Sequence, residues 1–254
     1  MNTLLVCSKS TRKFLPQYDR VRIVSSAPTK DILDEVGIEG DVIAIGGGAV
    51  IDTAKILSKN PIRCYPTTAA GSSSTSWSVY WDGTKKCSLK RMIPEDVILK
   101  KAFVEDLSDE VIMSTTCDVV SHCLDSMSSK KATDKSIRYC KEALDILRNK
   151  KHNFDLINAG HVAGKAIEIA GTNLLHSLSY PLTGYYNISH GIALGYLLPR
   201  LSKFMGFDVD DIIGKYKIQL NFDLDFVIKK ALKYEKIYEV NKSISNTILL
   251  EVLK

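Results

Sequence analysis

The sequence has few of the features of small secreted proteins or of membrane proteins. Its six cysteines are spread over 254 residues without a C-x-x-C pair, which is too sparse for a disulfide scaffold and favours reduced thiols in a cytoplasmic protein. No apolar run approaches the roughly 18 residues that a membrane-spanning helix needs, and the opening MNTLLVCSKSTRKF soon turns to charged residues. We therefore expect a soluble, unexported, cytoplasmic protein without a membrane partner.

A concentrated basic block is also missing. The formal net charge is +5, but the lysine pairs are scattered along the chain, and no DNA- or RNA-binding motif accompanies them. This distribution favours a solvated basic surface over a nucleic-acid interface. Hydrophobic residues make up 45% of the chain, which is enough for a folded core and argues against disorder.

Two patterns follow each other along the chain. In its first part, short β-rich runs alternate with a helical pattern, which indicates βαβ units and a parallel sheet. The runs are 3–7, 20–26, 41–48 and 62–68, with the helical pattern at 49–59. From about residue 108, apolar residues recur at helical spacing instead. The sequence predicts an α/β, Rossmann-like, dinucleotide-binding domain over residues 1–108 and an all-α, metal-binding domain over residues 109–254.

Three glycines, Gly46 to Gly48, follow a predicted strand directly and precede the predicted helix that holds Asp52. Glycines let a ligand approach the backbone closely, and a helix N-terminus offers N–H groups and a positive dipole end that suit a pyrophosphate. The pattern is not G-x-G-x-x-G, and a tight turn without a ligand is the alternative.

A hydroxyl-rich loop, YPTTAAGSSSTSW at 65–77, follows the next predicted strand. Such a cluster is either a solvated loop or a second wall of the same nucleotide site. Because open α/β sheets bind ligands at the carboxyl ends of their strands, the position of this loop favours the second interpretation.

Four side chains suggest a metal site. Asp118 and His122 are four residues apart, so on a helix they share one face. Such a pair alone is more typical of a surface contact. His176 and His190, at the two ends of a segment rich in Pro, Gly and Tyr, complete a set of one carboxylate and three imidazoles that suits Fe²⁺ or Zn²⁺. The remaining histidines, His152 and His161, are interpreted as surface and helix-packing residues.

These motifs, in this order, resemble the iron-dependent alcohol dehydrogenase family, whose fold is like that of dehydroquinate synthase. The matching segments are GGGAVIDTAK, PTTAAGSSS, DVVSHCLD and HSLSYPLTGYYNISHG. The resemblance implies a metal held by Asp118, His122, His176 and His190, and a bend of the Pro- and Gly-rich segment that brings the last two together. It also implies a nicotinamide cofactor bound by a set of small and polar residues. That set is Gly46, Gly47, Gly48, Asp52, Thr67, Thr68, Ser73 and Ser8.

The implied reaction is the reduction of a small aldehyde to an alcohol, with the metal acting as a Lewis acid and the reduced cofactor giving hydride. The stretches TSWSVYWDGTKKCSL and SYPLT resemble the phosphonoacetaldehyde reductase branch of the family. That resemblance implies a phosphonate substrate, for which four basic residues are candidates: Lys85, Lys86, Lys90 and Arg91. Exposed charges on a hairpin are the equally good alternative.

The chain departs from the family pattern at several places. Tyr180 stands where the family has a histidine thought to assist proton transfer, so we expect the tyrosine to take part in catalysis. Ser8 replaces an aspartate of NAD-preferring relatives, which favours NADPH over NADH. The chain is also unusually short for the family, which we interpret as internal trimming that either opens the cleft or shifts stability onto a homodimer interface. Glycerol-1-phosphate dehydrogenase, a dehydroquinate-synthase-like enzyme and a trimmed, non-catalytic relative are the alternatives.

Overall fold

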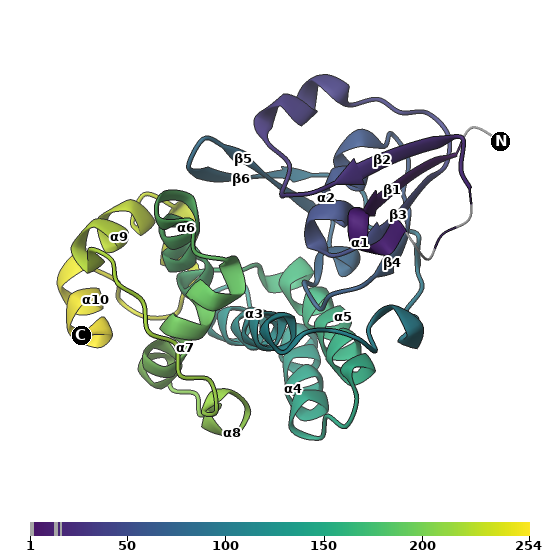
Figure 1. Ribbon diagram of the computed structural model, residues 1–254. Helices are drawn as coiled ribbons and strands as arrows, with labels where there is room; N and C mark the ends of the chain where they lie inside the picture. Colours follow the sequence, from purple (N-terminus) through teal and green to yellow (C-terminus); the bar gives the residue numbers. More distant parts are fainter. Residues whose placement is uncertain (1–2, 13–14, 16) are drawn as a thin grey trace.

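The computed structural model describes residues 3–12, 15 and 17–254. Its first part is a parallel sheet with the strand order β2-β1-β3-β4-β7 (Figure 1). The strands are β1 (Leu4–Ser8), β2 (Arg20–Val24), β3 (Val42–Gly46), β4 (Arg63–Pro66) and β7 (Asp96–Val97). The prediction of a parallel sheet from alternating β-rich runs is confirmed for the first four strands, whereas the two-residue β7 carries too little pattern to be predicted.

Strand β1, which lies between β2 and β3, is buried on both faces, as in parallel sheets covered from both sides. Leu4 and Val6 pack into one core together with α2 (Gly48–Leu57), while Leu5 and Cys7 pack into another on the opposite face. Short helical segments complete this part. They are α1 (Lys9–Arg12), η1 (Lys30–Glu35), η2 (Ser72–Ser74) and η3 (Lys101–Phe103).

An antiparallel hairpin extends from the sheet toward the helices. It consists of β5 (Trp77–Asp82) and β6 (Lys85–Lys90), paired over their whole length. Strand β5 packs against α2, and β6 packs against α6 (Leu174–Tyr186). The hairpin therefore links the sheet to the helical part (Figure 1).

The second part is helical, as the sequence predicts, and fills the teal-to-yellow side of Figure 1. Its longest helix, α3 (Asp109–Ser128), packs against α6 and against three further helices, α4 (Asp134–Arg148), α5 (Asn153–Ala170) and α7 (His190–Met205). Ser108 caps α3 by accepting from the Val111 N–H, and acidic residues fill the first turn, which suits the helix dipole. The other elements are α8 (Asp210–Ile213), α9 (Leu224–Ala231), η4 (Glu235–Glu239) and α10 (Asn246–Leu253).

The Pro- and Gly-rich segment between His176 and His190 is not the bend that the sequence predicts. It continues as α6 through Pro181 to Tyr186, and the chain reverses only at 187–189, where Asn187 has a left-handed backbone with φ of 54°. Proline costs a helix one backbone hydrogen bond, but α6 is buried against α7, α9 and the hairpin. Tertiary packing outweighs that local cost.

Among the described residues, no helix combines the length and the apolar character that crossing a membrane requires.

Candidate metal centre and cofactor cleft

Three histidines converge on one carboxylate oxygen. Asp118 Oδ1 lies 3.4 Å from His176 Nε2, 3.5 Å from His122 Nε2 and 3.8 Å from His190 Nε2. Asp118 and His122 come from α3, whereas His176 and His190 begin α6 and α7 respectively. The structure thus brings together all four side chains that the sequence selects as metal ligands.

Three of the four form a tighter group. The ligand atoms of Asp118, His176 and His190 all lie within 4.8 Å of one another. His122 lies beside this group, with its ring stacked on that of His176 at 4.7 Å between centroids.

The donor set fits a divalent metal ion. Asp118 Oδ1 and His176 Nε2 are buried and have no hydrogen-bond partner among the described residues. An unpartnered buried polar atom is costly, and two of them facing each other are accounted for by an ion between them. One carboxylate with imidazoles is a donor set of Fe²⁺ and Zn²⁺ sites. The metal-ligand role itself stays a prediction.

Two further side chains orient the imidazoles. Asp125 Oδ2 lies 2.9 Å from His176 Nδ1, and the same fully buried carboxylate accepts backbone N–H groups of Asn173, Leu175 and His176. The Ser179 hydroxyl lies 3.2 Å from His190 Nδ1. Contacts at Nδ1 leave Nε2 of both rings to face Asp118, which is how ligand histidines are usually held.

The protonation states of the cluster also suit metal binding. Burial raises the pKa of Asp118, but the attraction of His122, His176 and His190 outweighs it and holds the pKa well below its usual range. Burial lowers the pKa of His122 to about 4, and burial together with the charge of Lys86 lowers the pKa of His190. A carboxylate and neutral imidazoles are the forms that bind a cation.

A close helix contact places His190. A Cβ on the next residue, Gly191, would lie 2.1 Å from Ser114 Oγ and 2.2 Å from the Ser114 carbonyl oxygen. Only glycine therefore allows the start of α7 to lie this close to α3, one helical turn before Asp118.

A cavity of about 690 Å³ joins the histidine cluster to the glycine turn. Its walls come from the start of α2, the hydroxyl loop, the β5–β6 hairpin, the end of α5 and the segment 234–239. Gly48 and Asp52 line it at one end and His176 and His190 at the other. The cleft is therefore continuous from the predicted cofactor site to the predicted metal site.

The other predicted cofactor residues lie at the carboxyl edge of the sheet around this cleft. Ser8 and Gly46 end neighbouring strands, and the Thr67 N–H donates to the Gly46 carbonyl. Thr68 packs on Gly47, where a Cβ would meet its Oγ1 at 2.9 Å. Ser73 is buried in η2. None of these six residues lines the cavity directly, and their role in cofactor binding stays a prediction.

Lys55 fixes the hydroxyl loop to α2. Its buried ammonium donates to the carbonyl oxygens of Ser72, Thr75 and Trp77 and lies 3.5 Å from Asp52 Oδ1. A second anchor is the Ser74 hydroxyl, 2.6 Å from His161 Nδ1 on α5. His161 thus holds the loop, in addition to packing on its helix, while His152 is exposed at the start of α5.

The basic residues of the hairpin separate into different environments. Only Lys86 lines the cavity; Lys85 and Lys90 are exposed. Arg91 donates to the Lys55 and Ser58 carbonyls at the end of α2. Arg91 is therefore a structural residue, and the predicted four-residue phosphonate site is wrong for three of its members.

Tyr180 lies in the cavity wall next to the cluster around Asp118, and its ring is stacked on that of His190 with 6.0 Å between the centroids. Its hydroxyl accepts a hydrogen bond from Lys236, another cavity residue. No sequence pattern selects Lys236, because it is distant in the chain from the other site residues and stands in no motif. Asp125 and Ser179 follow His122 and His176 by three residues, so helical spacing offered a signal for both.

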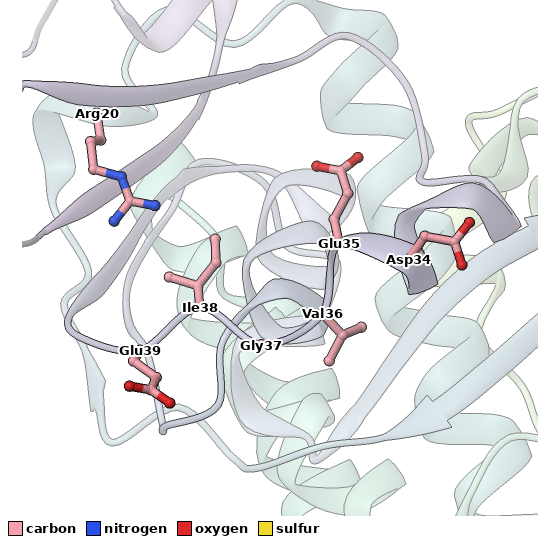
Figure 2. A pocket seen from close by; sticks show the side chains of 7 residues that line it. All are labelled: Arg20, Asp34, Glu35, Val36, Gly37, Ile38 and Glu39. Carbon is pink, nitrogen blue, oxygen red and sulfur yellow. The ribbon is translucent and has the colours of Figure 1, made fainter.

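A separate cavity of about 470 Å³ lies around the turn after η1 (Figure 2). Figure 2 shows it lined by the carboxylates of Asp34, Glu35 and Glu39 and by Arg20. Glu35 pairs with Arg22 and Glu39 with Lys59, all in exposed positions. This arrangement is typical of a solvated surface.

Comparison with known proteins identifies the family. Residues 112–246 match the family described as Fe-containing alcohol dehydrogenase family, C-terminal. The chain is 28% identical over 212 residues to phosphonoacetaldehyde reductase of Streptomyces viridochromogenes, and the alignment covers 66% of this chain and 54% of that protein. It is likewise 28% identical over 193 residues to a 1-propanol dehydrogenase of Salmonella typhimurium, covering 64% and 51%. The chain thus spans about half the length of the curated relatives it matches.

Solved structures share the fold. One is an iron-containing alcohol dehydrogenase, with a TM-score of 0.85 at 22% identity, covering 99% of this chain and 90% of that one. Another is a sulfoacetaldehyde reductase from Bifidobacterium kashiwanohense in complex with NAD⁺, with a TM-score of 0.82 at 19% identity, covering 99% and 89%. The family match extends over more than half of the chain and includes Asp118 and the three histidines around it. The chain belongs to the Fe-containing alcohol dehydrogenase family.

Proposed function

We propose that this chain reduces a small aldehyde to an alcohol with a bound divalent metal and a reduced nicotinamide cofactor. The observation that carries the proposal is the single cavity that joins the glycine turn to the cluster around Asp118. A cofactor lying on the sheet part and a metal in the helical part would meet in this space. When bound, the ion supplies Lewis-acid polarisation of a carbonyl and the cofactor supplies hydride.

Each part of the chain has its own task in this proposal. Asp118, His122, His176 and His190 hold Fe²⁺ or Zn²⁺. The glycine turn and the N-terminus of α2 receive the pyrophosphate. The carboxyl edge of the sheet carries Ser8 and no carboxylate at that position, which supports NADPH, with NADH as the alternative.

Tyr180 is proposed to hold the proton that the product alcohol needs. Burial raises its pKa, so the hydroxyl is protonated at neutral pH. Because Lys236 donates to the Tyr180 oxygen, the tyrosine proton is left for another acceptor, which is either the neighbouring Thr172 hydroxyl or a nascent alkoxide in the cavity.

Phosphonoacetaldehyde is the substrate to test first. The two curated relatives described above are named for a phosphonate aldehyde and for an uncharged alcohol, so the family alone leaves the charge of the substrate open. Lys86 in the cavity supports the charged one.

The test is cofactor oxidation, followed by absorbance, by protein reconstituted without oxygen with Fe²⁺ or Zn²⁺. NADPH and NADH are compared with phosphonoacetaldehyde and a set of uncharged aldehydes, and His190→Ala serves as the negative control. Metal-dependent turnover that the variant loses supports the proposal. No turnover of any aldehyde by protein that holds stoichiometric metal would overturn it.

A further inference from the structure

The cavity contains two ammonium groups without a counter-ion. Of its charged residues, Lys131 pairs with Glu239 at 3.3 Å and Asp52 lies against Lys55 at 3.5 Å. Asp118 belongs to the histidine cluster. Within the described part of the chain, no carboxylate forms an ion pair with the remaining two, Lys86 and Lys236. Both are only partly exposed.

The ammonium group of Lys236 donates two hydrogen bonds to neighbouring hydroxyls, which leaves one of its N–H donors unused. Lys236 lies in η4 and donates to Thr172 Oγ1 at 2.7 Å and to the Tyr180 hydroxyl. An ammonium group has three N–H donors. The third donor of Lys236 is therefore available to a ligand in the cavity that this side chain lines.

Lys86 approaches the same tyrosine from the hairpin. Its Nζ lies 4.4 Å from the centroid of the Tyr180 ring, and that of Lys236 lies 4.5 Å from it. The backbone N–H of Lys86 donates to the Tyr234 hydroxyl, and this hydrogen bond connects the hairpin to the segment before η4. Contact with an aromatic ring offsets part of the cost of removing a cation from water, but two like charges around one ring still repel each other.

We propose that Lys86 and Lys236 bind the oxyanion head group of the aldehyde substrate, beside Tyr180 and the metal cluster. This inference rests on the proposed reductase function and specifies its substrate class. Two ammonium groups match a head group that carries up to two negative charges, and a phosphonate meets this better than a carboxylate or sulfonate.

The position of the pair also limits the length of the substrate. The Tyr180 ring that both lysines contact lies 6.0 Å from the His190 ring. A head group at the lysines and a carbonyl at the histidine cluster are therefore joined by a short carbon linker.

The experiment compares Lys236→Gln and Lys86→Gln with Lys85→Gln, a control one residue away on the exposed side of the hairpin. Binding of 2-hydroxyethylphosphonate to Zn²⁺-loaded protein is measured by calorimetry, with 1-propanol as the uncharged probe. We expect each cavity variant to weaken phosphonate binding roughly 10- to 100-fold, the range for one charged hydrogen bond, and Lys85→Gln to leave it unchanged. Lys236→Arg, which keeps the charge, should retain more affinity than Lys236→Gln.

Kinetics separate this inference from the proposed function. The ratio of kcat/KM for phosphonoacetaldehyde over that for an uncharged aldehyde should fall at least tenfold in each cavity variant. Turnover of aldehydes with an unchanged ratio and unchanged phosphonate affinity in both variants would overturn the anion site and leave the reductase intact. Lysine-dependent phosphonate binding without any turnover would support the anion site and overturn the reductase. Circular dichroism confirms that each variant is folded.

Discussion

Asp125 Oδ2 lies 2.9 Å from His176 Nδ1, and this contact determines which nitrogen of His176 faces Asp118. Burial raises the pKa of Asp125, but the contact with His176 and the backbone N–H donors outweigh it, so the pKa lies below its usual value. An ionised carboxylate only accepts, so Nδ1 of His176 is the donor of this contact, and Nε2 is the nitrogen that remains to face Asp118. Asp125, which is not itself a proposed ligand, thus orients the ring of the proposed ligand His176.

Asp125→Asn should weaken metal binding. The asparagine can accept fewer of the four N–H groups that Asp125 satisfies and sets an amide group against some of them. We expect roughly 10- to 100-fold weaker Zn²⁺ binding, as for other residues that orient metal ligands, and a loss of about 1–3 kcal/mol of unfolding free energy.

The measurement is Zn²⁺ affinity by competition with a chromophoric chelator. Glu110→Gln, an exposed change near the start of the same helix, is the matched control and should bind Zn²⁺ like the wild type. Equal Zn²⁺ affinity of Asp125→Asn and the control would show that Asp125 does not position His176.

Local sequence patterns predict the main strands and helices and one pair of the proposed metal ligands. Period-two and buried runs predict β1 to β4, and helical spacing predicts α3, α4 and α7. Asp118 and His122 share a helix face, which spacing alone reveals. The proximity of His176 and His190 follows from the family pattern, because nothing local links two helices.

Tertiary contacts account for what the sequence could not reveal. Pro181 suggested a bend, but burial of α6 keeps the helix intact. Lys236 enters the cavity only because η4 folds back onto α6. The sequence predicts that Arg91 binds an anion, yet its side chain donates to the Lys55 and Ser58 carbonyls at the end of α2. These three features depend on contacts between segments that are distant in the chain, and no local sequence pattern encodes such contacts.

Gly191→Ala should displace His190 from the cluster. The added methyl group would meet both the side chain and the carbonyl of Ser114, so α7 must move away from α3. We expect a loss of about 1–3 kcal/mol of unfolding free energy from overpacking and weaker Zn²⁺ binding.

A substitution at the other end of α7 separates the loss of stability from the loss of Zn²⁺ affinity. Gly206 follows the last residue of the helix with φ of 85°, and a Cβ added to it would meet no other atom within 4 Å. Gly206→Ala should lose about 1 kcal/mol through backbone strain while Zn²⁺ affinity is retained. If both variants lose affinity in proportion to stability, the packing at Gly191 has no specific role in the metal site.

Lys55→Met should loosen the hydroxyl loop and weaken cofactor binding. The substitution preserves much of the side-chain volume but removes the ammonium group that donates to the carbonyls of Ser72, Thr75 and Trp77, all three of which line the cavity. Buried carbonyls left without a partner cost about 1–3 kcal/mol. Fluorescence titration with NADPH should show a higher Kd, whereas Lys59→Met, an exposed lysine just after the same helix, should leave the Kd unchanged.

His161 should make stability depend on pH in the weakly acidic range. Burial lowers its pKa to about 4, from an ordinary value of 6.5. Between these values the unfolded chain binds more protons than the folded one, so unfolding free energy falls as the pH drops from 6.5 toward 4. In His161→Gln, the pH profile of urea denaturation should be shallower over this range, by up to about 1.4 kcal/mol per pH unit. If unfolding free energy changed equally with pH in the wild type and in His161→Gln, His161 would not be the source of this pH dependence.

Lys236 should give the reaction an alkaline limit that depends on the charge of the substrate. Burial lowers the pKa of Lys236 to about 8, while Asp125 acts in the opposite direction. The groups that contact its ammonium are the Tyr180 and Thr172 hydroxyls, and Lys86 lies against the same tyrosine ring. Burial raises the pKa of Tyr180, so Lys236 loses its proton first as the pH rises.

Above pH 8 the neutral amine no longer attracts an anion, so KM for phosphonoacetaldehyde should rise by up to roughly tenfold per pH unit. KM for an uncharged aldehyde should lack this rise. Lys236→Arg keeps its charge over the same range because a guanidinium stays protonated, and its KM for phosphonoacetaldehyde should therefore stay flat between pH 7 and 10. A rise in KM that is equal for both aldehydes, or that persists in the arginine variant, would place the titrating group elsewhere than on Lys236.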